Sequence, residues 1–236
     1  MDTITLTEEM KAALALLEDE SKRLIWISGR AGTGKSTFLQ FLKQQVHPKN
    51  SVYLAPTAVA ALTIGGQTIH SFFWLDPKEK AYFETRLDSD KERQLFSRLA
   101  IVETIVIDEI SMVRADILDE IDRRMRRAKR NAEQPFGGSR LLLIGDAYQL
   151  PPVAPDPFTS TGDLFERRYK SPFFFSSKVL RTKARQINHI EFTRVFRQNE
   201  VDFLALSHPS RPPDPPPAPP HLPQPPPAPP PPLPGT

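Results

Sequence analysis

Nine residues near the start of the chain, Gly29 to Thr37 (GRAGTGKST), constrain its fold more than any other stretch. Their spacing follows the pattern G-x-x-x-x-G-K-[ST], a loop whose backbone N–H groups surround the phosphates of a nucleotide. Gly32 and Gly34 allow the tight turn, Lys35 brings a positive charge to the β- and γ-phosphates, and Ser36 offers a hydroxyl to Mg²⁺. We therefore expect the nucleotide to contact Gly29, Ala31, Gly32, Thr33, Gly34, Lys35, Ser36 and Thr37.

The sequence on both sides of this loop supports the same interpretation. Residues Arg23 to Ser28 (RLIWIS) form a short apolar run, as expected of a buried parallel strand. After Lys35, apolar residues recur at helical spacing up to Val46. A strand, a glycine-rich loop and a helix in this order place the phosphates at a helix N-terminus. The alternative, a glycine turn with a chance lysine, leaves both flanks unexplained.

Composition narrows the class of protein. The chain has 236 residues and 26 prolines, most of them near its C-terminal end, so one α/β domain of about 200 residues is expected. A net charge of +3 permits a nucleic-acid partner without requiring one. The lack of cysteine excludes disulfides and thiolate sites. With no long apolar run and no signal-peptide pattern, we expect a soluble intracellular protein that does not enter membranes.

Apolar strands alternate with helical patterns along the chain, which predicts an α/β fold with a doubly wound parallel sheet. After the loop, strands are expected at Ser51–Thr57, Thr104–Ser111 and Arg140–Asp146. Weaker strand candidates are Phe173–Ser176 and Gln186–Phe192. Helices are expected over Thr5–Glu20 with Thr7 as its N-cap, over Ala58–Phe73 with a break at Gly65-Gly66, over Lys91–Glu103 and over Ala115–Arg130.

The helix ADILDEIDRRMRRAKR (Ala115 to Arg130) carries a run of arginines. We expect its apolar residues, such as Ile121 and Met125, to face the core and its arginines to point outward. The run could bind nucleic acid or form a solvated face with i,i+4 pairs between carboxylates and arginines. The interleaved Asp and Glu residues favour the solvated face.

Carboxylates end two of the predicted strands. Asp108 and Glu109 follow TIVI, and Asp146 follows RLLLIG. In an open α/β sheet, ligands bind beyond the carboxyl ends of the strands, so these residues should share one rim with Lys35. Asp108 would hold Mg²⁺, with Ser36, and Glu109 would polarise an attacking water, as phosphoryl transfer requires.

Two polar loop residues lie near that rim. Gln149 could sense the γ-phosphate or orient water; without the surrounding motifs, a loop glutamine that caps the backbone would be an equal alternative. Thr57 follows another strand end and would join the same rim.

The composition changes at about Ser207, after which proline dominates. We expect residues 1–206 to form the folded domain and residues 207–236 to form a disordered tail with polyproline II character. The tail could be a ligand for proline-reading domains, an inert extension, or translated sequence unrelated to the domain. Because proline tracts are common and rarely specific, we favour the inert extension or the unrelated translated sequence over a specific ligand.

The motifs together resemble the N-terminal motor domain of superfamily I DNA helicases of the petite integration frequency (PIF) family, to which RecD-like helicases are related. The resemblance extends over about residues 5–205 and rests on these segments: GRAGTGKST, APTAVAALTIGGQTIHSFF, VIDEISMVRADILDEIDRRMR, PFGGSRLLLIGDAYQLPPV and EFTRVFRQNEVDF. It implies a RecA-like fold, use of ATP and Mg²⁺, and single-stranded DNA as partner. Repair, recombination and telomere maintenance are associations of the family.

The resemblance also implies roles for single residues. Lys35, Ser36, Asp108 and Glu109 match the phosphate, metal and catalytic ligands of the family, and Gln149 matches the glutamine that couples the γ-phosphate to DNA. The match extends to an arginine that contacts the γ-phosphate (Arg197) and to a segment that lies along single-stranded DNA (Pro56, Thr57 and His70). In that segment Phe72, Phe73 or Trp74 could stack on bases, but core packing is the favoured role.

Two departures from the family pattern matter. Met10 stands where the family has a glutamine that reads adenine. The second RecA-like domain, with its arginine finger, should follow Leu206, where the proline-rich segment stands instead. A missing arginine finger can lower hydrolysis by roughly 10³ to 10⁵. We therefore expect a chain that binds ATP·Mg²⁺, hydrolyses it slowly and does not unwind DNA alone. The alternatives are a non-catalytic nucleotide- or DNA-binding remnant, an interaction protein acting through its tail and, less well supported, a kinase.

Overall fold

The computed structural model describes residues 6–46, 48, 50–76, 89–146, 149–155, 158 and 160–196, without the side chains of 160 and 161. Six parallel strands form one sheet in the order β3-β2-β4-β5-β1-β6. The strands are β1 (Leu24–Gly29), β2 (Ser51–Ala55), β3 (Gln67–Thr68), β4 (Thr104–Ile107), β5 (Arg140–Ile144) and β6 (Ile187–Phe192). The expected doubly wound parallel sheet is confirmed.

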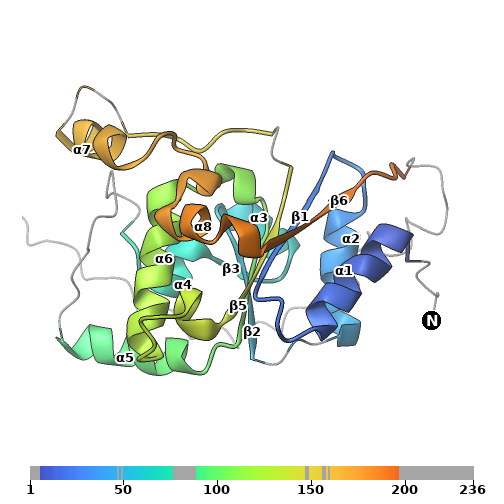
Figure 1. Cartoon of the computed structure of the whole chain (residues 1–236), viewed down its shortest axis with the longest axis horizontal. Coiled ribbons are helices and arrows are strands. Elements are labelled where there is room, and N and C mark those ends of the chain that lie inside the picture. Colours follow the sequence, from blue (N-terminus) through green and yellow to red (C-terminus); the bar gives the residue numbers. More distant parts are fainter. Residues whose placement is uncertain are drawn as a thin grey trace, which may run out of the picture.

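Helices cover both faces of this sheet (Figure 1). They are α1 (Glu8–Glu18), α2 (Lys35–Phe41), α3 (Ala58–Thr63), α4 (Ile69–Phe73), α5 (Ser89–Ala100), α6 (Ala115–Ala128), α7 (Ser160–Arg168) and α8 (Lys178–Thr182). Short turns of 3₁₀ helix lie at Ile110–Met112, Pro135–Gly138, Phe174–Ser176 and Ala184–Gln186, and α2 continues into a π-helical turn at Leu42–Val46. No described helix is both long and apolar enough to cross a membrane.

The core has two main layers because successive side chains of a strand point to opposite faces. Ile105 and Ile107 of β4 pack with the α4, α5, α6 and α8 layer. Val106, between them, packs with the α1 and α2 layer. Since both faces are covered, every residue of β4 is buried, and the strand reads as a continuous apolar run.

Hydroxyl caps begin the helices near the rim of the sheet. Thr7 accepts a hydrogen bond from the N–H of Met10 at the start of α1, as the sequence predicted. Thr57 accepts one from Ala60 at the start of α3, at 3.2 Å. The helix predicted over Ala58–Phe73 is divided at Gly65-Gly66, where the short strand β3 intervenes. A Cβ at Gly66 would lie 2.3 Å from the carbonyl oxygen of Tyr53, so only glycine fits this close approach to β2.

Helix α6 corrects one expectation, since not all of its arginines point outward. The Arg124 side chain is 1% exposed, and its Nε donates to Glu120 at 2.6 Å. Its Nη1 donates to the carbonyl of Phe73 at the C-terminal end of α4. A buried guanidinium is tolerated because a carboxylate and helix-terminal carbonyls neutralise and solvate it.

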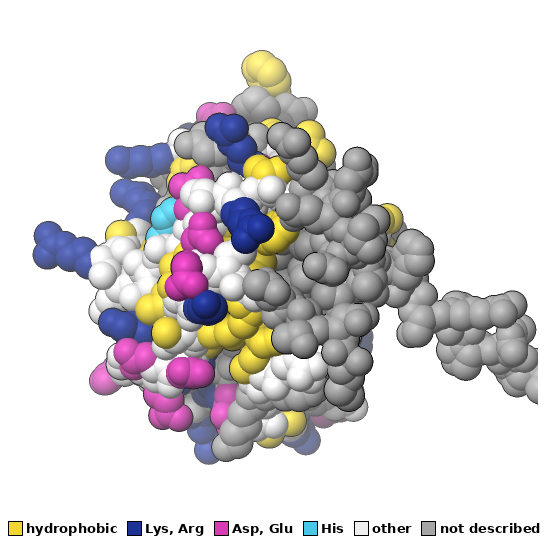
Figure 2. Space-filling view, turned by 90° about the vertical axis from the view of Figure 1, so that its right-hand side faces the viewer, with side chains coloured by type: hydrophobic (Ala, Val, Ile, Leu, Met, Phe, Trp, Pro, Cys, Tyr) yellow, Lys and Arg dark blue, Asp and Glu magenta, His cyan; other side chains and the backbone are white. Residues whose placement is uncertain are grey.

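The remaining arginines of α6 confirm the predicted pairing with carboxylates, but the face is only partly solvated, because the Arg123 side chain is 29% exposed and its partner Glu120 1%. Ion pairs join Arg123 to Glu120, Arg126 to Asp122 and Arg127 to Glu92. On the face shown in Figure 2, positive and negative side chains are interspersed.

The weaker strand candidates had different outcomes. Gln186–Phe192 is confirmed as β6, one residue shorter. The strand prediction for Phe173–Ser176 was wrong: Phe174–Ser176 is a 3₁₀ turn, and Phe173 makes only an isolated bridge to Arg114. The chain turns there because the Ser177 side chain caps α8 at once.

Phe72 and Phe73 are buried, so core packing is their role.

Candidate functional site

The phosphate-binding loop lies between β1, which ends at Gly29, and α2, which begins at Lys35. Gly32 and Gly34 have φ angles of 78° and 84°, the left-handed region that favours glycine. A Cβ at Gly34 would also lie 2.7 Å from the Met10 side chain. The predicted strand, glycine loop and helix are therefore present, and the glycines have the tight backbone that the motif requires.

Lys35 lies across the loop. Its Nζ donates to the carbonyl oxygens of Gly29, at 2.6 Å, and Arg30, at 2.9 Å. Burial lowers the pKa of Lys35, while the negative charges of Asp146, Glu109 and Asp108 oppose that shift. The three carboxylates at the strand ends are thus near enough to act on the charge of Lys35.

The strand order explains how those carboxylates meet. β5 lies between β4 and β1, with Ile107 in register with Leu143 and Ile27 with Ile144. Asp108, Glu109 and Asp146 follow these strand ends directly, beside the loop that follows β1. The shared rim that the sequence predicted is therefore present, including Asp146, to which we had assigned no role.

Asp108 and Glu109 have different environments. Asp108 is 7% exposed, and burial raises its pKa to about 6. Glu109 adopts a left-handed backbone (φ 51°, ψ 45°) as the N-cap of the 3₁₀ turn Ile110–Met112. Left-handed glutamate is uncommon, and such residues concentrate at functional sites.

A groove of about 360 Å³ brings several predicted residues together. We call it the carboxylate groove; its walls include Ser36, Thr57, Asp108, Glu109, Met112, Gln149 and Leu150. The Gln149 side chain is exposed, and its backbone N–H donates to the Asp146 carbonyl at 3.2 Å. Arg197, the remaining predicted catalytic residue, lies outside the described residues, as does segment 207–236.

The groove has the ligands that Mg²⁺ prefers. Mg²⁺ is bound through one or two hard oxygens together with substrate phosphates. Ser36 supplies a hydroxyl and Asp108 a carboxylate to the same groove. The raised pKa of Asp108 marks a carboxylate whose negative charge a cation would stabilise. The donor set therefore fits the ion.

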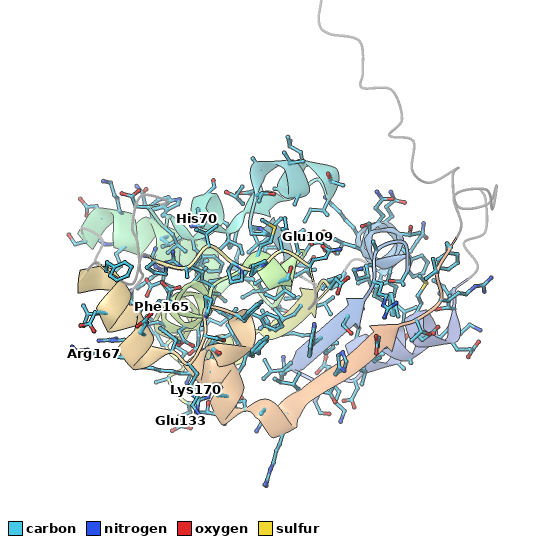
Figure 3. All side chains as sticks on the ribbon, turned by 90° about the horizontal axis from the view of Figure 1, so that it is seen from above. His70, Glu109, Glu133, Phe165, Arg167 and Lys170 are labelled. Carbon is cyan, nitrogen blue, oxygen red and sulfur yellow. The ribbon has the colours of Figure 1, made fainter. Side chains whose placement is uncertain are left out.

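A second groove, of about 180 Å³, contains all three residues predicted to contact DNA. We call it the His70 groove; its walls are Pro56, Thr57, Ile69, His70, Met112, Val113, Arg114, Ile117, Pro151, Pro152 and Val153. Burial and the nearby Arg114 lower the pKa of His70. His70 belongs to α4, and Glu109 follows the end of β4; both are labelled in Figure 3.

Sequence reasoning missed two further features of this region. After β6 the chain passes over the phosphate loop: the Phe196 N–H donates to the Gly32 carbonyl at 2.9 Å. A Cβ at Gly34 would lie 3.1 Å from the Phe196 ring, on the same residue that Met10 contacts. Met112 borders both grooves. Its position soon after the two carboxylates was the only signal, and nothing distinguished it from a core methionine.

Comparisons with known proteins agree with this geometry. A family model described as PIF1-like helicase matches residues 5–203. The chain is 39% identical over 150 residues to the ATP-dependent DNA helicase Pif1 of Bdellovibrio bacteriovorus, covering 64% of this chain and 34% of that protein. It is 35% identical over 202 residues to the human ATP-dependent DNA helicase PIF1, covering 85% of this chain and 29% of that protein.

A solved structure gives the same result in three dimensions. The Pif1 helicase from Bacteroides, in complex with ADP-AlF3 and single-stranded DNA, superposes with a TM-score of 0.71 at 36% identity. The match covers 86% of this chain and 45% of that one. The chain thus spans about a third or less of the two curated relatives and under half of the solved structure. With sequence, fold and rim geometry in agreement, the chain belongs to the PIF1-like helicase family.

Proposed function

We propose that this chain is a helicase-type ATPase domain that binds ATP·Mg²⁺ in the carboxylate groove and single-stranded DNA in the His70 groove. The observation that carries the proposal is the position of the phosphate loop beside the ends of β4 and β5, where three carboxylates act on the charge of Lys35. The ligands named for the Bacteroides relative, ADP-AlF3 and single-stranded DNA, support the same assignment.

Each rim residue has a role that follows from its chemistry. The loop N–H groups and Lys35 bind the phosphates, and nucleotide entry replaces the lysine's hydrogen bonds to Gly29 and Arg30. Ser36 and Asp108 hold Mg²⁺, which neutralises phosphate charge when bound. Glu109 polarises the attacking water.

The remaining assignments extend the same site. Gln149, which lines the carboxylate groove, senses the γ-phosphate, and Arg197 stabilises the charge that develops on it. Gly29, Ala31, Gly32, Thr33, Gly34, Ser36 and Thr37 complete the nucleotide contacts. Because Met10, an apolar side chain, contacts the loop, we propose weak discrimination among nucleotide bases.

For DNA, Thr57 offers a hydroxyl and His70 an imidazole beside the apolar walls of the His70 groove. Hydroxyls hold phosphates, and apolar side chains contact bases without reading their sequence. Since its pKa is lowered, His70 acts as a neutral hydrogen-bonding group near pH 7. DNA binding through this groove should therefore be sequence-tolerant.

We further propose that residues 1–206 form the ATPase domain and that residues 207–236 contribute nothing to its ligand binding. The described residues contain one RecA-like sheet. Helicases move by closing two motor domains around ATP. The 236-residue polypeptide assayed alone is therefore expected to hydrolyse ATP slowly and not to unwind a tailed duplex.

The deciding experiment measures ATP hydrolysis by the purified chain with and without a single-stranded oligo-dT, beside Lys35→Ala. Lys11→Ala is the matched control, because Lys11 is an exposed lysine of α1 that forms an ion pair with Glu8. We expect DNA-stimulated turnover that Lys35→Ala abolishes and Lys11→Ala retains. Removing residues 207–236 should leave turnover and melting temperature unchanged.

Other outcomes point to the alternatives. Lys35-dependent nucleotide binding without turnover would mean a non-catalytic member of the family. Equal activity of Lys35→Ala and the wild type would refute the assigned site. Unwinding of a tailed duplex by the chain alone would refute the requirement for a second motor domain.

A further inference from the structure

The carboxylate groove and the His70 groove share a wall made of Thr57 and Met112. Thr57 already has a local role, because its side chain caps α3 through the Ala60 N–H. Within the described part of the chain, the Met112 side chain makes no such bond, and it is half-buried between the two grooves. A ligand that fills either groove therefore contacts this methionine.

Met112 is tied directly to the carboxylate that faces the nucleotide. The Met112 N–H donates to the carbonyl oxygen of Glu109 at 3.1 Å, and the Val113 N–H donates to that of Ile110 at 3.0 Å. These bonds form the single 3₁₀ turn that Glu109 begins. A shift of the Met112 backbone is thus transmitted to Glu109 within one turn.

This turn carries two unfavourable features. Glu109 has the left-handed backbone described above, which glutamate seldom adopts. Ser111 is fully buried, and its hydroxyl has no hydrogen-bond partner within the described part of the chain. Buried hydroxyls are nearly always paired, so an orphan of this kind calls for an explanation. Strain and an orphan hydroxyl in four consecutive residues are typical of a segment with a second arrangement.

The opposite side of the turn is fixed. A Cβ at Gly145 would lie 2.9 Å from the Ile110 backbone nitrogen and 3.1 Å from its Cγ2. Ile110 itself is fully buried. Because the turn rests on β5 at Ile110, the side that can respond to a ligand is the one that carries Met112.

We propose that Met112 is a positioning residue that couples the two grooves: DNA in the His70 groove biases the turn Glu109–Met112 and thereby the place of Glu109 at the nucleotide. This inference rests on the proposed function, since it assumes that both ligands bind. Coupling is reciprocal in binding free energy, so bound nucleotide changes DNA affinity by the same factor. The factor by which one ligand changes the affinity of the other measures this coupling.

The test measures that factor by binding, which does not depend on turnover. The Kd of a fluorescein-labelled oligo-dT is determined by anisotropy, without nucleotide and with ADP·AlF4 and Mg²⁺. For the wild type we expect the two Kd values to differ by about 5- to 150-fold, the usual range of coupling. In Met112→Ala the ratio should fall to within about twofold of one, whatever the change in either affinity alone.

Three control variants separate coupling from simple damage to a wall. Leu150 lines only the carboxylate groove, and Val153 lines only the His70 groove. Leu150→Ala and Val153→Ala should each weaken one ligand and keep the ratio. Met112→Leu, which restores an apolar side chain of similar volume, should recover the ratio. If Met112→Ala does not fold, Met112→Gln of similar length replaces it.

The outcomes are distinct. A wild-type ratio retained in Met112→Ala overturns the proposal, and so does a ratio of one in a wild type that binds both ligands. Loss of the ratio in Leu150→Ala or Val153→Ala as well would assign coupling to the grooves in general and overturn the role of Met112. A wild type that binds neither ligand refutes the proposed function itself.

Discussion

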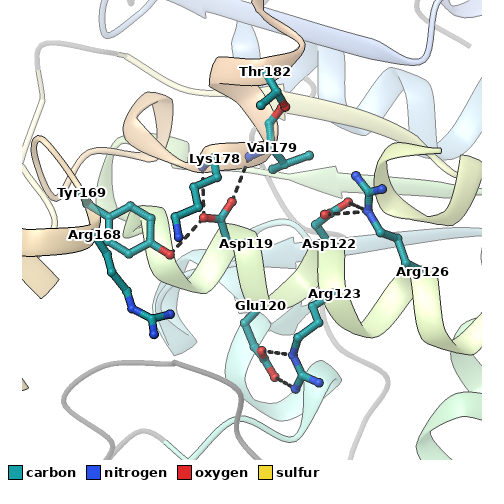
Figure 4. Close-up of a pocket in the computed structure, with 10 residues that line it drawn as sticks. All are labelled: Asp119, Glu120, Asp122, Arg123, Arg126, Arg168, Tyr169, Lys178, Val179 and Thr182. Atoms are coloured by element: carbon teal, nitrogen blue, oxygen red, sulfur yellow. Dashed lines mark hydrogen bonds and ion pairs between the residues drawn. The ribbon is translucent and has the colours of Figure 1, made fainter. Parts of the chain in front are cut away.

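Two groups of carboxylates in this molecule, each with at least one buried member, have opposite surroundings. On α6, Asp119 accepts hydrogen bonds from the Tyr169 hydroxyl and from the N–H groups of Lys178 and Val179 (Figure 4). At the rim, Asp108 and Glu109 form no ion pair with any arginine or lysine of the described chain, and Asp108 accepts a hydrogen bond from the Glu109 N–H.

The α6 group is also neutralised by charge. Glu120 accepts from Arg123 and Arg124, and Asp122 from Arg126. Burial of a charge is tolerated where partners satisfy it, and is costly where they do not. The comparison teaches which carboxylates support the fold: those of α6 have their counter-ions within the chain, whereas those of the rim leave room for a cation from outside.

The largest expected effect is on the α6 side. Glu120→Ala leaves the Arg124 guanidinium, 1% exposed, without its counter-ion. The free energy of unfolding should fall by about 3–5 kcal/mol, as when one partner of a buried pair is removed. Urea unfolding followed by circular dichroism measures it. Glu109→Ala is the rim control and should change stability by less than about 1 kcal/mol; equal losses in both variants would erase the contrast.

A substitution at the rim should change the free energy of unfolding in the opposite direction, towards greater stability. Asp108→Asn keeps the shape and removes a poorly solvated charge, so without Mg²⁺ and nucleotide it should raise stability at pH 7.5 by about 1–3 kcal/mol. The pKa of Asp108 is raised to about 6 in the folded state, from 3.8. The folded wild type thus binds the extra proton between these values and gains stability as pH falls.

The pH dependence sharpens this prediction. The advantage of Asp108→Asn should be complete above pH 6 and should vanish below about pH 4, where the wild-type carboxyl is protonated in both states. Melting temperatures measured across this range test it. A destabilised Asp108→Asn at pH 7.5 would show that the rim carboxylate supports the fold after all.

The smallest expected effect probes one hydrogen bond of the α6 group. Tyr169→Phe removes the 2.9 Å bond to Asp119 but leaves that carboxylate its two backbone donors. The free energy of unfolding should fall by about 0.5–1.5 kcal/mol in urea. Burial also raises the pKa of Tyr169, so ultraviolet titration should detect no phenolate from this residue while the chain is folded. If Tyr169→Phe left the free energy of unfolding unchanged, the two backbone donors alone would be enough to satisfy the Asp119 carboxylate.

The sheet was predictable because burial on both faces makes each strand of a parallel sheet a continuous apolar run. The same property misled at Phe173–Ser176, since a short apolar run fits a 3₁₀ turn equally well. Arg124 was misplaced because periodicity marks it as polar, whereas its burial depends on Glu120 and on a carbonyl 51 residues earlier. Such tertiary partners leave no trace in local spacing.

The candidate site likewise has a part that could be predicted from the sequence and a part that could not. The phosphate loop and the pair Asp108-Glu109 are contiguous motifs, so their chemistry could be assigned from spacing alone. The His70 groove combines residues near 56, 70, 112 and 152, and its shared wall with the carboxylate groove exists only once β2 and β4 are neighbours. Strand order, which the apolar pattern does not encode, decides these contacts.

The hydrogen bond from the Phe196 N–H to the Gly32 carbonyl attaches the segment that follows β6 to the phosphate loop. A load applied to the chain at residue 196 acts first on the loop that surrounds the phosphates, because no secondary structure intervenes between them. Tension on the polypeptide beyond β6 should therefore alter how tightly the phosphate loop binds the nucleotide. A pulling experiment that holds the chain beyond β6 would register nucleotide occupancy as a change in rupture force.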